Sequence, residues 1–115
     1  MDQRKDRRHE TKLYVKLSAH SVSSWGLLGD ISANGLFIKS IRGYERGEVL
    51  DLSIFMPDGS VSLLKGAVRR IVDLPELHWK FGLGVELIEK DMTYGYYHKF
   101  LGKKRKESVG MSSAS

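Results

Sequence analysis

Apolar and polar side chains alternate along much of this chain, as they do in a β-strand with one buried face. Leu13, Val15 and Leu17 are followed in turn by a tyrosine, a lysine and a serine. Alternation or a short apolar run recurs in five later segments, residues 25–31, 36–38, 50–56, 60–72 and 79–87. The pattern therefore predicts six short strands.

Turn chemistry and phase changes add detail to the predicted sheet. The Pro-Asp-Gly sequence at 57–59 separates the fourth and fifth strands. Because proline fixes φ and glycine accepts unusual backbone conformations, this sequence predicts a hairpin. The apolar phase of the fifth strand shifts between Leu63 and Leu64, which predicts a β-bulge that bends the sheet. We also expect Trp25 and Trp79 to face the core.

The period of the pattern changes after Asp91. Apolar and aromatic residues then recur at helical spacing up to Leu101, which predicts a C-terminal α-helix whose first turn Asp91 caps. Gly95 and Gly102 each weaken a helix by on the order of 1 kcal/mol relative to alanine, so its aromatic stripe must pack on something.

Six short strands followed by one helix predict an all-β-dominated fold. We expect a six-stranded antiparallel β-barrel, because closure removes the sheet edges that invite aggregation, with one C-terminal α-helix docked on the mouth of the barrel. The expected organisation is a flexible basic arm over residues 1–11, the barrel and helix over 12–106, and a disordered tail over 107–115.

Composition and charge narrow the class of protein. The chain has 115 residues and no cysteine, which fits one domain in a reducing compartment and excludes disulfides and thiolate metal sites. No apolar stretch approaches a membrane span and the first residues are charged, so we expect a cytoplasmic protein. The formal charge is +5, and residues 1–12 and 99–107 carry five Lys/Arg each against three and one acidic residues. Phosphate-bearing partners are therefore favoured, although basic ends also serve solubility.

Two polar clusters carry the candidate chemistry, and the first is Arg4-Lys5-Asp6-Arg7-Arg8. An arginine fork binds phosphate, bonds the guanine acceptors O6 and N7, and stacks on a purine. Arg4 and Arg8 are spaced to act together. In the alternative without a ligand, Asp6 forms ion pairs with the neighbouring arginines on the surface, where such pairs contribute little to stability.

The second cluster is Asp30-Ile31-Ser32-Ala33-Asn34-Gly35. Asp30 is able to accept hydrogen bonds from N1 and N2 of guanine, Ser32 to donate or accept beside it, and Gly35 to let the backbone approach a ligand or adopt positive φ. Taken alone, these residues are also typical of a turn.

Together the two clusters, Arg-x-x-x-Arg and Asp-x-Ser-x-x-Gly, closely resemble the PilZ domain of bacteria. Residues 35–38 after the second cluster and 82–86 in the final strand also resemble that family, so the likeness runs from about residue 4 to residue 102. The family's fold is a six-stranded barrel with a C-terminal helix, and its usual ligand is cyclic di-GMP.

The resemblance implies a role for each matching residue. Arg4 and Arg8 correspond to the arginines that hold guanine and phosphate, and Asp30, Ser32 and Gly35 correspond to the loop residues that read guanine. Lys5 and Arg7 either add ligand contacts or are solvated. Gln3 stands where some members have a further arginine, which favours one ligand per chain.

We therefore expect a cyclic di-GMP receptor whose arm becomes ordered when ligand binds. No segment beyond the barrel and helix is long enough for an output domain, so the chain is expected to signal to an unidentified downstream protein. The alternatives are a single-stranded nucleic-acid binder of small-barrel type and a PilZ module that has lost its ligand. No catalytic motif or metal-ligand spacing is present, so we expect neither an enzyme nor a cofactor.

Overall fold

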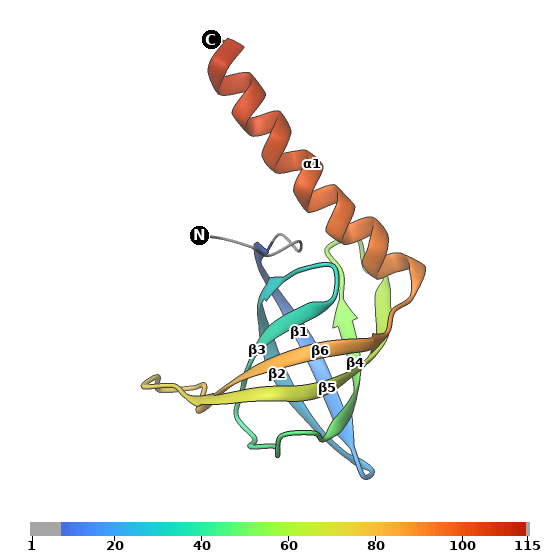
Figure 1. Ribbon diagram of the computed structural model, residues 1–115, viewed down its shortest axis with the longest axis vertical. Coiled ribbons are helices and arrows are strands. Elements are labelled where there is room, and N and C mark those ends of the chain that lie inside the picture. The colour runs from blue at the N-terminus through green and yellow to red at the C-terminus, as the bar shows by residue number, and fades with distance from the viewer. Residues whose placement is uncertain (1–7, 115) are drawn as a thin grey trace.

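Six strands form one closed antiparallel barrel, and a single helix follows them (Figure 1). The computed structural model describes residues 8–114, except for the side chains of residues 104–114. Around the barrel the strand order is β1-β2-β3-β6-β5-β4, and β4 pairs with β1 to close it. The elements are β1 (His9–Ala19), β2 (Val22–Ile31), β3 (Gly35–Ser40), β4 (Val49–Phe55), β5 (Val61–Asp73), β6 (Phe81–Glu89) and α1 (Met92–Ala114). The predicted barrel and helix are confirmed.

The core fills the inside of the barrel with side chains from every strand. Alternation places one face of each strand inward, and the resulting apolar cluster excludes water almost completely. Burial of this kind is the main favourable contribution to folding. The most deeply buried apolar residues of the strands are Val15, Leu17, Leu28, Ile31, Leu36, Ile38, Leu50, Leu52, Ile54, Val68 and Leu83.

β-Bulges lie at different places from the one predicted. The β4–β5 register runs without interruption through Leu63 and Leu64, and the β5–β6 register shifts between Lys65 and Gly66 and again between Val68 and Arg70. The prediction was wrong because Leu63 faces solvent, 63% exposed. An exposed leucine and an inward serine on the same strand imitate a change of phase.

Trp25 also lies on the opposite face from the one predicted. Its side chain is 50% exposed, and its ring packs on Phe55 outside the barrel with a centroid distance of 5.4 Å. Inside the barrel the neighbouring Gly26 leaves no room for a Cβ, which would come within 2.8 Å of the Lys39 carbonyl oxygen. Trp79 precedes β6 and is only half-buried.

Tight turns connect the strands. Residues 57–59 form the predicted β4–β5 hairpin, in which Gly59 adopts a φ of 91° and Asp58 accepts hydrogen bonds from the backbone and hydroxyl of Ser60. The β1–β2 hairpin turns instead on His20 and Ser21, whose φ angles are 53° and 66°. Its sequence lacks the glycine that usually marks such a turn.

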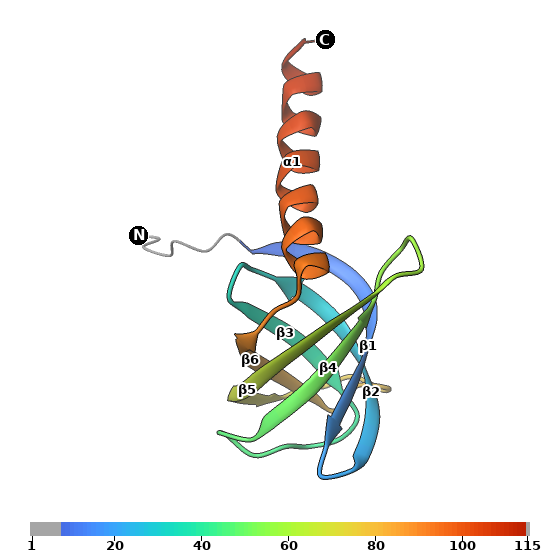
Figure 2. The same cartoon turned by 90° about the vertical axis from the view of Figure 1, so that its right-hand side faces the viewer.

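Helix α1 begins as predicted and docks on one end of the barrel. The Oδ1 atom of Asp91 accepts a hydrogen bond from the Tyr94 backbone N–H at 3.0 Å, which caps the helix. The helix then rises away from the barrel (Figure 2). Its first turns contact β1, where the Tyr97 and Thr11 hydroxyls lie 2.7 Å apart.

The outer boundaries differ from those expected. Strand β1 already includes residues 9–11, which were assigned to the arm, and α1 continues through residues 107–114, which were expected to be disordered. The polar run after Leu101 contains no proline to stop a helix, whereas its lack of apolar periodicity suggested disorder.

Candidate ligand-binding site

A surface pocket of about 680 Å³ lies where the two predicted clusters meet. It is lined by residues of the neighbouring strands β3 and β6, with Asp30 of β2 on one side and Arg69 and Arg70 of β5 on the other. The volume falls within the range usual for small-molecule sites. Four of the predicted residues line this pocket, namely Arg8, Asp30, Ser32 and Gly35.

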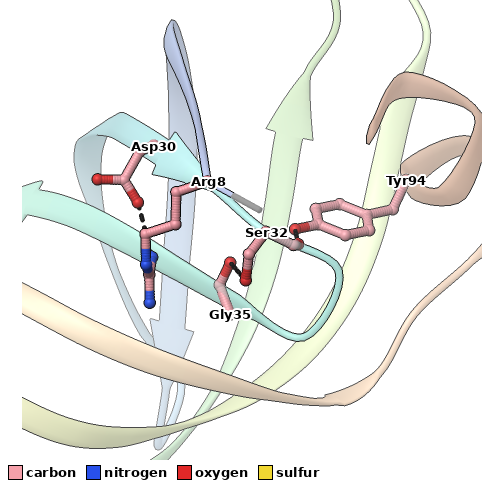
Figure 3. Close-up of polar contacts among 5 residues, drawn as sticks. All are labelled: Arg8, Asp30, Ser32, Gly35 and Tyr94. Carbon is pink, nitrogen blue, oxygen red and sulfur yellow. Dashed lines mark hydrogen bonds and ion pairs between the residues drawn. The ribbon is translucent and has the colours of Figure 1, made fainter. Parts of the chain in front are cut away.

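Arg8 and Asp30 form an ion pair at the edge of the pocket. Arg8 Nη1 donates to Asp30 Oδ1 at 2.7 Å, and the two side chains are 43% and 29% exposed. Arg8 directly precedes β1, and the antiparallel pairing of β1 with β2 brings it close to Asp30. Figure 3 shows the two side chains facing each other beside the Ser32–Gly35 turn. Both remain accessible to a ligand.

Ser32 fixes the turn that follows β2. Its backbone N–H donates to the Gly35 carbonyl oxygen at 2.9 Å, and its hydroxyl donates to the same oxygen at 3.3 Å. The residue is only 2% exposed. On the far side of the turn, the Tyr94 hydroxyl of α1 donates to the Ser32 carbonyl oxygen (Figure 3). Ser32 therefore joins the pocket to the helix.

Gly35 keeps the pocket open at its base. A Cβ there would lie 3.2 Å from the Val85 carbonyl oxygen and 3.8 Å from Arg8 Nη2, so a larger side chain would project toward the arginine. Positive φ is found at Gly47 and Gly59 among the described glycines, and not at Gly35. The glycine therefore provides close approach and not an unusual backbone conformation.

The remaining arginine-cluster residues fall outside the described part of the chain. Arg4, Lys5 and Arg7 belong to residues 1–7, and their assignment to the site stays a prediction. Residues 8–114 contain no group of three side chains suited to a metal ion. Within the same range, no helix is long and apolar enough to cross a membrane.

The structure adds pocket residues that the sequence did not indicate. Phe37, Arg69, Arg70 and Glu86 all line the pocket. They belong to strands that were predicted, but their outward orientation alone did not show that they share one site. The strand order β3-β6-β5 brings them together.

Tyr94→Phe should destabilise the protein by about 1–2 kcal/mol, because it leaves the buried Ser32 carbonyl oxygen without its donor. Urea unfolding followed by circular dichroism measures the loss. Tyr14→Phe is the matched control, since Tyr14 is 60% exposed and its hydroxyl is expected to bond water. Equal unfolding midpoints for the two variants would contradict the importance of this bond.

Comparison with known proteins gives the same fold. The chain is similar to a Bacillus subtilis inhibitor of motility (MotI/DgrA), with a TM-score of 0.76 and 21% identity over 93% of this chain and 53% of that one. It is also similar to the YcgR PilZ domain from Escherichia coli, with a TM-score of 0.71 and 10% identity over 99% and 100% of the two chains. It is similar as well to K. pneumonia MrkH in its apo state, with a TM-score of 0.72 and 12% identity over 94% of this chain and 54% of that one.

These similarities concern the fold, and the chain spans about half the length of the first and third of these structures. A search of curated proteins found no match. A family model described as the PilZ domain matches residues 2–95. Because this match covers most of the sequence and the strands close into the expected barrel, the chain belongs to the PilZ domain family.

Proposed function

We propose that this protein is a cytoplasmic receptor for cyclic di-GMP and acts as an effector. The observation that carries the proposal is the Arg8–Asp30 ion pair at the edge of a pocket that the Ser32–Gly35 turn also lines. Similar folds support the ligand class, because the E. coli YcgR domain and K. pneumonia MrkH have structures with c-di-GMP.

The exposed groups of the pair complement a guanine nucleotide. The Asp30 carboxylate accepts from the N1 and N2 donors of the base, while the Arg8 guanidinium bonds O6 and N7 or a phosphate. An exposed ion pair contributes little to stability, so exchanging it for ligand contacts costs little. The aromatic ring of Phe37 offers an apolar surface at the same pocket.

Ligand binding is proposed to tie the arm to the barrel. Arg4 would hold the ligand together with Arg8, with Arg7 and Lys5 as possible further phosphate contacts. The arm and the base of α1 then present an altered surface to a downstream protein. The hydrogen bond from Tyr94 to the Ser32 carbonyl supports α1 as part of that surface, since it joins the helix to the pocket turn.

Titration with cyclic di-GMP tests the receptor proposal. Calorimetry should give saturable binding, with much weaker binding of cyclic di-AMP and GTP, and the amide signals of residues 1–12 should shift on saturation. The salt dependence of the affinity separates this function from single-stranded nucleic-acid binding, which weakens steeply with salt and shows little base preference. Absence of binding to cyclic di-GMP would refute the receptor proposal.

A further inference from the structure

A second arginine–carboxylate pair lines the same pocket. Arg69 Nε donates to Glu86 Oε1 at 2.7 Å, and the two side chains are 59% and 57% exposed. This pair comes from β5 and β6, whereas Arg8 directly precedes β1 and Asp30 belongs to β2. The pocket therefore contains two pairs of the same chemistry.

Strand register separates the two pairs across the pocket. Asp30 pairs with Phe37, Phe37 with Gly84, and Gly84 with Arg70, so one row crosses β2, β3, β6 and β5. Neighbouring strands are about 4.8 Å apart, which places β2 and β5 about 14 Å apart in this row. Arg69 precedes Arg70 on β5.

Two glycines lie between the two ion pairs and place no side chain there. Glu86 lies directly opposite Gly35 in the β3–β6 pairing, and Gly35 has no side chain to separate it from the motif turn. Gly84 is likewise bare, and a Cβ there would lie 3.3 Å from the Arg70 Cβ. Between the two pairs the row holds Phe37 and the bare Gly84, so a single ligand that spans both pairs would lie across the Phe37 ring.

We propose that Arg69 and Glu86 read the second guanine of cyclic di-GMP, while Arg8 and Asp30 read the first. This inference rests on the receptor function proposed above. Glu86 accepts hydrogen bonds from N1 and N2 of the base, and Arg69 donates to O6 and N7. Each of the two guanines would thus contact one arginine–carboxylate pair. Adenine at the second position would present an N6 donor to Arg69 and only the N1 acceptor to Glu86.

The mixed cyclic dinucleotide of GMP and AMP isolates the second position, because its one guanine can occupy the Arg8–Asp30 pair. Wild-type protein should prefer cyclic di-GMP over the mixed ligand by about tenfold or more, the discrimination expected of a good bidentate contact. In Arg69→Ala and Glu86→Gln the preference should fall below about threefold. Calorimetric titration of both ligands gives the ratio for each variant.

Lys39→Ala is the matched control. Lys39 also forms an ion pair on the barrel surface, 2.9 Å from Glu76, but it does not line the pocket. This variant should keep the wild-type preference. Circular dichroism should show wild-type unfolding for Arg69→Ala, since the lost pair is exposed.

The outcomes distinguish failure of this inference from failure of the receptor function. If Arg69→Ala weakens both ligands equally, Arg69 contacts phosphate and the second-base assignment is wrong. If Arg69→Ala keeps the preference while Arg8→Ala loses cyclic di-GMP binding, the receptor function stands and the inference fails. If wild-type protein binds neither dinucleotide, both are overturned.

Discussion

Arg8→Ala should weaken cyclic di-GMP binding at least tenfold, equivalent to about 1.4 kcal/mol or more. The variant removes the cation that lies 2.7 Å from Asp30 at the pocket edge, and with it a bidentate contact to base or phosphate worth about 1–3 kcal/mol. It also leaves the Asp30 carboxylate facing an anionic ligand without its counter-charge. Isothermal titration calorimetry of the two proteins at the same ionic strength measures the difference.

Arg46→Ala controls for the loss of one positive charge. Arg46 lies in the exposed loop between β3 and β4 and does not line the pocket. It changes the net charge by the same amount, so any general electrostatic attraction of the ligand weakens equally in both variants. An affinity of Arg8→Ala no lower than that of Arg46→Ala would remove Arg8 from the site.

The barrel was predictable because its strands follow one simple rule. Where a strand is regular, as from Val15 to Leu17, inward and outward residues alternate and the sequence displays the buried face directly. The rule fails where a polar residue points inward and forms a hydrogen bond with a residue that is distant in the sequence. Ser62 is fully buried because Asp91, almost thirty residues later, accepts its hydroxyl hydrogen bond at 2.7 Å.

The Trp25 error has a related cause. Alternation with Leu27 and Ile31 suggested a core position for Trp25. The inside of β2 is instead shaped by Gly26, which lets the side chains of Leu17 and Ile38 approach its backbone. A bulge between Leu28 and Asp30 then changes the phase of the strand. Packing against distant strands decides such positions, and a single strand's pattern does not contain that information.

Some residues of the candidate site could likewise be predicted from the sequence, and others could not. The Arg8, Asp30, Ser32 and Gly35 positions could be predicted because they occur in two short motifs. Arg69 and Glu86 could not, because each is one polar residue on an alternating strand. Their shared pocket depends on the β5–β6 register, which two bulges shift. A motif is contained in a short stretch of sequence, whereas the opposite wall of this pocket depends on the strand order β3-β6-β5, which brings distant segments side by side.

Asp91→Ala should lower the free energy of unfolding by about 2–4 kcal/mol, which combines a lost helix cap with lost charge-assisted hydrogen bonds. One carboxylate holds α1 to the barrel: Oδ1 accepts from the Ser62 hydroxyl and the Tyr94 backbone, and Oδ2 accepts from the Leu63 backbone at 2.8 Å. Without it the buried Ser62 hydroxyl also loses its partner. Urea unfolding at neutral pH measures the change.

The same contacts predict how the Asp91 effect depends on pH. Partial burial raises the pKa of Asp91, but the hydrogen bonds from Ser62, Leu63 and Tyr94 outweigh it, so the pKa lies below its ordinary value of 3.8. The stabilisation is therefore fully present above about pH 4 and is lost as the pH falls through the lowered pKa of the folded state. The difference in unfolding free energy between wild type and Asp91→Ala should be constant from pH 7 to pH 5 and shrink below pH 4.

Asp58→Ala is the matched control for this titration. Hydrogen bonds from the Ser60 hydroxyl and backbone also lower the pKa of Asp58, but that carboxylate serves only the exposed β4–β5 turn. Its removal should cost less than removal of Asp91 and leave the contacts between α1 and the barrel intact. If the two variants lost equal stability, or if the Asp91 effect did not change below pH 4, the carboxylate would not be what fastens the helix beside the pocket turn.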